Sequence, residues 1–172
     1  MGIALIASLL AASEPKPHQT PWFLPRYAAV QTMFRPGAVV PSLRLGFEID
    51  LIDQPRNTLV FLLEGGGALG AANRNAGLFY TGLVLFGLGY RSLRESGFIW
   101  GFSVGFGPAF YGLPGENRVS PYIEGRLQAG AKLGPITLQL CGGYGQWVTY
   151  LPTSTAQLYL GGPFLGILLG WK

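Results

Sequence analysis

The sequence is poor in charge and has no long apolar run, and each shortage excludes a class of structure. Only 12% of its 172 residues are charged, which is about half the share of an ordinary soluble domain. A helical membrane span needs about 18 consecutive apolar residues, and no run of that length occurs between Glu14 and Lys172. Because the mean hydropathy is still positive, at +0.33, the apolar residues have to be spread along the chain by alternation.

Cysteine and histidine are also scarce. The single cysteine, Cys141, rules out an intramolecular disulfide and metal clusters built on cysteine, and we expect it to be a small packed residue. The only histidine is His18, near the N-terminus. We therefore expect no metal site and no cofactor. The net charge of +4 contains no basic run of the kind that binds nucleic acid, so we expect no nucleic-acid partner either.

The N-terminal 25 residues differ in composition from the rest. Residues 1–13, "MGIALIASLLAAS", have an apolar core of signal-peptide length that ends in small residues. Residues 14–25 are rich in proline and predict an extended tail. The pattern of residues 1–13 predicts a signal peptide, and the alternative is a disordered or interfacial segment. Residues 26–172 are predicted to form the folded domain.

The stretch from Gly97 to Gly107, "GFIWGFSVGFG", shows how the rest of the chain is patterned. In an extended strand its large apolar side chains share one face, and the other face is nearly bare. The apolar face carries Phe98, Trp100, Phe102, Val104 and Phe106, and the bare face carries Gly101, Ser103, Gly105 and Gly107. Such alternation, with turn signals between segments, is the pattern of a β-barrel whose strands cross a membrane.

Similar alternation predicts eight strands, at about 26–34, 42–51, 58–70, 78–91, 97–107, 122–131, 136–145 and 157–171. The triple glycine at 65–67 predicts a bulge or bend in the third strand. The connections "RPGAVVP", "AANRNAG", "LPGENRVSP" and "LPTST" fall at one end, and the shorter "IDQPRN", "RSLRES" and "KLGP" fall at the other. By length, the shorter set is predicted to be periplasmic, together with both termini.

The size of the barrel decides which face is inside. Eight strands enclose only enough room for side chains or one small ligand, so the bulky apolar faces are predicted to contact lipid; in the second strand these are Leu43, Leu45 and Phe47. The polar residues predicted to line the lumen are Arg44, Glu48, Asp50, Glu64, Arg91, Glu124, Arg126, Gln128 and Gln139. Both charge signs occur, and we expect them to pair across the lumen.

These features resemble the small eight-stranded bacterial outer-membrane barrels of the OmpA and OmpX type. The last strand ends in an alternating series closed by an aromatic residue, a pattern that the barrel-assembly machinery reads in such proteins: Leu165, Ile167, Leu169 and Trp171. Lys172 departs from the pattern, because the aromatic residue is penultimate. The resemblance implies an all-β, antiparallel, up-and-down transmembrane barrel in the outer membrane, with lipid, lipopolysaccharide and the assembly machinery as partners.

Some small outer-membrane barrels are lipid A deacylases or acyltransferases, with chemistry resembling that of a serine hydrolase with a histidine base. Here His18 precedes the first strand, and Ser42 and Ser103 lack a base, so we expect no catalytic residues and no enzyme. A wide pore needs about 16 strands. We expect a barrel with a largely plugged lumen and a structural or loop-binding role; the loop residues that stand out are Arg74, Glu116, Asn117 and Arg118. The alternatives are a soluble lipocalin-like carrier of a small apolar ligand and a narrow ion-conducting pore.

Overall fold

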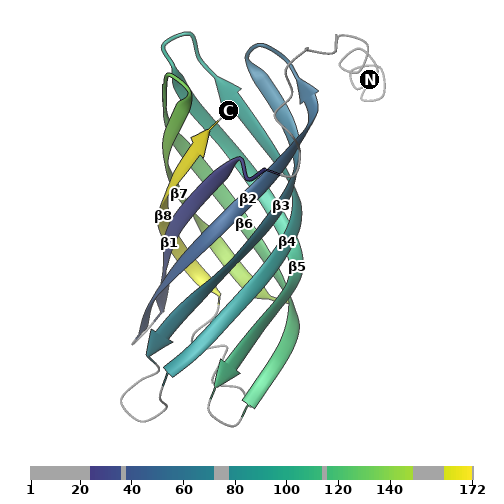
Figure 1. Ribbon diagram of the computed structural model, residues 1–172, viewed down its shortest axis with the longest axis vertical. Coiled ribbons are helices and arrows are strands. Elements are labelled where there is room, and N and C mark those ends of the chain that lie inside the picture. Colours follow the sequence, from purple (N-terminus) through teal and green to yellow (C-terminus); the bar gives the residue numbers. More distant parts are fainter. Residues whose placement is uncertain (1–23, 36–37, 72–77, 114–115, 149–160, 172) are drawn as a thin grey trace.

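The computed structural model describes residues 24–35, 38–71, 78–113, 116–148 and 161–171. Each strand pairs antiparallel with the next, and β1 pairs with β8, so the sheet closes into a barrel of eight strands (Figure 1). This confirms the predicted fold class. The strands are β1 Tyr27–Arg35, β2 Ala38–Asp53, β3 Asn57–Ala71, β4 Leu78–Leu93, β5 Phe98–Leu113, β6 Glu116–Leu133, β7 Ile136–Trp147 and β8 Gly162–Trp171.

The strands of the middle of the chain are longer than the sequence predicts. β2 begins at Ala38 and β6 at Glu116, so most of "RPGAVVP" and "LPGENRVSP" belongs to strands and not to connections. We placed strand ends at prolines because proline lacks a donor for the ladder. The structure carries the sheet through them: Pro41 stands opposite Thr32, and Pro108 stands opposite Pro121.

The bulge lies elsewhere than predicted. β3 runs without interruption through Gly65, Gly66 and Gly67, which keep a regular register with both neighbouring strands, so no bulge forms there. The register shifts instead between Asp50 and Ile52 of β2, near the end of that strand. No glycine marks this position, and the alternating pattern of the sequence contains no signal for it.

The two faces of β5 differ as strongly in the structure as in the sequence. Phe98, Phe102 and Phe106 point outward and remain 47%, 46% and 52% exposed. Gly101 and Gly107 point into the barrel and are buried. A Cβ atom at Gly107 would lie 2.0 Å from the main-chain oxygen of Val84, so the bare face allows a close approach that a larger residue would block.

The two ends of the barrel are connected differently. The turns at 54–56, 94–97 and 134–135 lie at one end, with the start of β1 and the end of β8, at the top of Figure 1. Two of these turns use glycine with a positive φ, 81° at Gly97 and 65° at Gly134, a conformation that other residues adopt at a cost. We call this the turn end. β1, β3, β5 and β7 end, and β2, β4, β6 and β8 begin, at the opposite end, which we call the loop end.

The predicted N-terminal boundaries lie outside the described residues, since residues 1–23 are not among them. The signal peptide at 1–13 and most of the tail at 14–25 therefore stay predictions. The predicted start of the last strand, near residue 157, also lies outside this part; β8 begins at Gly162, directly after the bend at Gly161. None of the described residues forms a helix long and apolar enough to span a membrane.

Candidate functional site

All nine polar residues that the sequence assigns to the lumen occupy inward positions of their strands. Arg44, Glu48, Glu64, Glu124, Arg126 and Gln139 are buried, and Asp50, Arg91 and Gln128 are partly buried. The structure divides them into a central cluster, two ion pairs nearer the turn end, and amides that stand apart.

Four charged residues form the centre of the lumen, and we call them the central network. Arg44 donates from Nη1 to Glu64 Oε1 and from Nη2 to Glu124 Oε2, both over 2.8 Å. Arg126 donates to the same two carboxylates, over 2.8 Å to Glu64 Oε1 and 2.9 Å to Glu124 Oε1. Each guanidinium therefore bonds both carboxylates, and the network joins β2 and β3 to β6 on the opposite wall.

Two tyrosines extend the central network, and neither is among the lumen residues expected from the sequence. Tyr27 donates a 2.5 Å hydrogen bond to Glu64 Oε2, which ties β1 to the network. The Tyr122 hydroxyl lies 3.4 Å from Glu124 Oε2. Tyr122 precedes Glu124 by two residues, so the period of a strand places both on the same face. That shared parity was the available signal for Tyr122.

The central network is electrically balanced. It holds two guanidinium and two carboxylate groups, and the side chains of Arg44, Glu64 and Glu124 are at most 4% exposed. A buried unpaired charge costs several kcal/mol, and the crossed pairing leaves none of the four without a partner of opposite sign. Arg44 also lies over the ring of Phe164, with Cζ 6.0 Å from the ring centre.

The other predicted lumen residues make separate contacts. Arg91 pairs with Glu48, and Arg26 lies 4.0 Å from Asp50. Gln139 Nε2 is 3.5 Å from the hydroxyl of Thr137.

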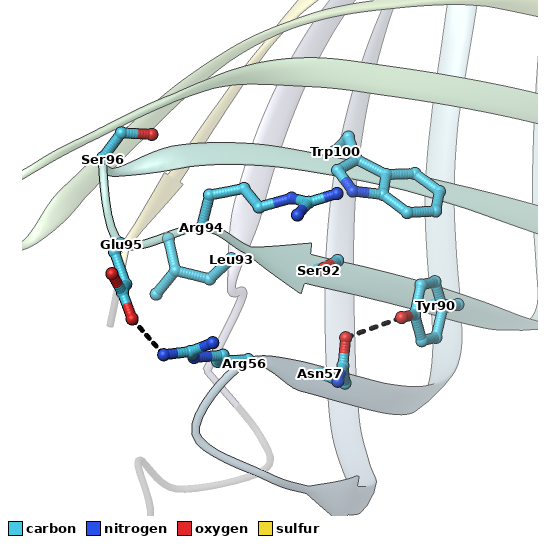
Figure 2. A pocket seen from close by; sticks show the side chains of 9 residues that line it. All are labelled: Arg56, Asn57, Tyr90, Ser92, Leu93, Arg94, Glu95, Ser96 and Trp100. Atoms are coloured by element: carbon cyan, nitrogen blue, oxygen red, sulfur yellow. Dashed lines mark hydrogen bonds and ion pairs between the residues drawn. The ribbon is translucent and has the colours of Figure 1, made fainter.

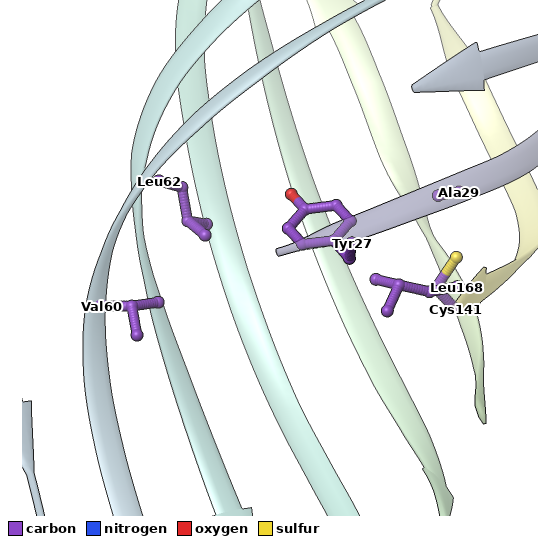
Figure 3. Packing of buried hydrophobic residues seen from close by; sticks show 6 residues of the cluster. All are labelled: Tyr27, Ala29, Val60, Leu62, Cys141 and Leu168. Atoms are coloured by element: carbon purple, nitrogen blue, oxygen red, sulfur yellow. The ribbon is translucent and has the colours of Figure 1, made fainter. Parts of the chain in front are cut away.

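Part of the lumen is apolar, whereas the sequence predicts an interior filled by polar side chains. Figure 3 shows Tyr27, Ala29, Val60, Leu62, Cys141 and Leu168 as a buried cluster inside the barrel. Cys141 is 3% exposed, and its sulfur lies 3.9 Å from Gln31 Nε2. The cluster packs beside the central network, because Tyr27 belongs to both: its ring contacts the apolar side and its hydroxyl bonds Glu64.

Little free volume remains around the central network. One cavity beside Glu48, Arg91 and Arg126 measures about 10 Å³, and one beside Glu64, Glu124 and Arg126 measures about 20 Å³. A single water needs roughly 10 to 15 Å³ by this measure. Each of the two spaces is close to the size of one water, and neither amounts to an aqueous channel.

The residues predicted to contact lipid or to act in assembly lie on the outer wall. Leu43, Leu45, Trp100 and Val104 are exposed there, and Phe47 is partly exposed. Along β8 the outward side chains are Leu165, Ile167, Leu169 and Trp171.

The serine, histidine and loop candidates are scattered. The Ser42 hydroxyl donates to the main-chain oxygen of Gln31 over 3.3 Å, and Ser103 borders both small cavities of the lumen. Asn117 is exposed at the loop end and accepts a 3.0 Å hydrogen bond from Tyr80, and Arg118 beside it is exposed as well. His18, Arg74 and the side chain of Glu116 lie outside what the structure describes.

Comparison with known proteins gives a structural likeness and no family. No family model matches the chain, and no curated protein matches it. Among solved structures, it is similar to the crystal structure of the outer membrane enzyme PagL, with a TM-score of 0.56 and 12% sequence identity. The likeness covers 83% of this chain and 97% of that one. The chain therefore has the fold of a small eight-stranded outer-membrane barrel.

This likeness corrects one expectation from the sequence. We expected a barrel that is not an enzyme, because its strands contain no histidine to act as a base. The fold is shared with an outer-membrane enzyme, so an eight-stranded barrel does not by itself argue against catalysis. The expectation was wrong because the lack of a histidine base excludes one catalytic mechanism and does not exclude catalysis as such.

Proposed function

We propose that this chain is an integral outer-membrane barrel with a closed lumen, which acts at its lipid-facing wall and at its two ends. The observation that carries the proposal is the central network. Arg44 and Arg126 each bond Glu64 and Glu124, and so fill the middle of the barrel from wall to wall. A solute crossing the lumen would have to break several buried ion pairs at once.

The outer wall supports a membrane location over a soluble carrier. In a lipocalin-like barrel the apolar face of each strand turns inward around its ligand. Here large apolar side chains point outward on every strand from β1 to β8, with Val30 58%, Leu88 53% and Ile167 53% exposed as examples. Leaving such a continuous apolar wall in water is unfavourable, and lipid removes that cost.

The partners that we propose follow from this location. The outer wall contacts membrane lipid and lipopolysaccharide, and the end of β8 presents Leu169 and Trp171 to the barrel-assembly machinery. The loop end faces outside the cell, where Asn117 and Arg118 belong to a surface that an unidentified partner can contact. A structural role in the envelope and a role in loop binding both fit this arrangement.

Cell fractionation with gel mobility tests the proposal. The full chain, expressed in a Gram-negative host, is expected in the outer-membrane fraction. It is also expected to migrate faster on a gel when it is not boiled, because a folded barrel resists detergent. Recovery of folded protein in the soluble fraction without detergent would contradict the proposal and favour the soluble carrier.

A further inference from the structure

A pocket of about 700 Å³ opens on the outer wall at the turn end, away from the central network (Figure 2). It lies where β3 and β5 begin and β4 ends, next to the turns at 54–56 and 94–97. Asn57 pairs with Ser92, and Ser92 pairs with Trp100, so the three residues form a row across the strands. Asn57 and Ser92 place an amide and a hydroxyl where the apolar outer wall stops.

Two aromatic side chains form one wall of the pocket. Tyr90 and Trp100 meet edge to face, with ring centres 5.6 Å apart and planes at 60°. The Tyr90 hydroxyl donates to Asn57 Oδ1 over 2.7 Å, which leaves the amide nitrogen of Asn57 available as a donor. Tyrosine and tryptophan concentrate where membrane meets water, since each has an apolar body and a polar group.

The charge of the pocket is net positive. Arg56 pairs with Glu95, and both side chains are well exposed. Arg94 makes no ion pair within the described part of the chain, and Figure 2 shows its side chain extending toward Trp100. The pocket therefore contains two guanidinium groups, of Arg56 and Arg94, and one carboxylate, of Glu95. One positive charge is left over. A guanidinium beside amide and hydroxyl donors suits a phosphate oxygen.

The wall next to the pocket is apolar. Leu88 and Phe102 lie one step further from the turn end, and are 53% and 46% exposed. Phe102 also contacts Tyr90, with ring centres 5.7 Å apart. A polar, positively charged pocket that continues into an apolar surface matches a ligand with an anionic head and hydrocarbon chains.

We propose that this pocket binds the phosphate diester of a glycerophospholipid. Arg94 pairs with a phosphate oxygen, Asn57 and Ser92 donate hydrogen bonds to it, and the acyl chains lie along Leu88 and Phe102. The inference rests on the proposed membrane location, because it places the turn end at the boundary between lipid and water. It goes further by assigning a defined lipid site to one side of the barrel.

The test compares two single substitutions that remove one positive charge each. Arg94→Gln removes the unpaired guanidinium of the pocket, and Lys132→Gln removes an exposed cation at the same end that does not line the pocket. The detergent-solubilised full chain is titrated with dioleoylphosphatidylglycerol, and native mass spectrometry measures the bound lipid. Arg94→Gln is expected to weaken binding about fivefold or more, as loss of one lipid-facing cation predicts, and Lys132→Gln to leave it within about twofold of the unchanged protein.

Two further measurements show which part of the lipid the pocket recognises. Dioleoylglycerol, which has the same chains and no phosphate, is expected to bind the unchanged protein weakly, and millimolar inorganic phosphate is expected to leave the phospholipid bound. Equal binding of dioleoylglycerol, displacement by free phosphate, or equal losses in the two variants would overturn the lipid site. A gel-mobility assay on each variant shows that it is folded, and outer-membrane fractionation tests the location separately, so a failed lipid site is distinguishable from a failed membrane assignment.

Discussion

Arg44 and Glu124 are 80 residues apart in the chain and are joined by a 2.8 Å hydrogen bond through the middle of the barrel. Arg44 belongs to β2 and Glu124 to β6, which are separated by three strands in either direction around the closed sheet. The bond therefore connects opposite walls. Together with the other contacts of the central network, it fills the lumen with side chains from both walls.

Removal of one charge from the central network is expected to destabilise the barrel more than removal of an opposite pair. Glu124→Gln leaves Arg44 and Arg126 sharing a single carboxylate, and loss of one buried partner costs about 3 to 5 kcal/mol of unfolding free energy. The double variant Arg44→Gln with Glu124→Gln leaves the neutral pair Arg126 and Glu64 and is expected to be less destabilised than Glu124→Gln alone. Urea unfolding in lipid vesicles measures both.

The exposed pair Arg56 and Glu95 provides the control. Its side chains are 67% and 80% exposed, so Arg56→Gln is expected to change stability by less than about 1 kcal/mol. If the effects of Arg44→Gln and Glu124→Gln were simply additive, the central network would not act as a unit.

Tyr27 is expected to stabilise the barrel through its hydroxyl. Tyr27→Phe keeps the ring over Gly46 but removes the 2.5 Å bond to Glu64. A hydrogen bond to a charged group contributes about 1.5 to 3 kcal/mol, and that loss should appear in the unfolding free energy. Tyr80→Phe is the matched control, since the bond that it removes, to Asn117, is exposed. Equal effects of the two substitutions would argue against a special role for Tyr27.

The stability cost of a charged residue on the outer wall should increase with its depth in the membrane. Val104 points outward from the middle of β5, and Val119 points outward near the loop end. Val104→Arg is expected to cost about 2 to 4 kcal/mol and Val119→Arg about 0 to 1 kcal/mol. Refolding yield and stability in vesicles measure the difference, and similar values for the two would contradict the membrane position of β5.

The inward glycines of β5 are expected to be necessary for close strand approach. Gly107→Ala would place a methyl group 2.0 Å from the main-chain oxygen of Val84, whereas a Cβ at Gly125 would meet nothing within 4 Å. Overpacking of this kind costs about 1 to 3 kcal/mol, and Gly125→Ala should be nearly neutral. Thermal or urea unfolding of the two variants compares them directly, and a tolerated Gly107→Ala would mean that the strands can separate at this point.

The faces of the strands could be predicted from the sequence because the period of a strand is two. Phe98, Trp100 and Phe102 lie outward and Arg44 and Glu64 lie inward, as alternation requires. Strand ends were less predictable. Pro41 and Pro121 are common signals for a break, yet the closed sheet extends past both of them.

The pairing inside the lumen could not be predicted from alternation. Parity places Arg44, Glu48, Glu64 and Glu124 on inward faces, but it gives no information about their relative heights, which depend on the stagger of all eight strands. Arg44 meets Glu64 and Glu124, while Glu48 meets Arg91 instead. The register shift between Asp50 and Ile52 could not be predicted either, because alternation gives no information about register.

Single-channel recording in planar bilayers tests the closed lumen most directly. The purified full chain is reconstituted after gel mobility has shown that it is folded, and current is recorded under an applied voltage. We expect a silent bilayer, because the ion pairs of the central network cross the lumen and the two cavities beside it are each close to the size of one water. Large, stable channels from the folded protein would contradict it.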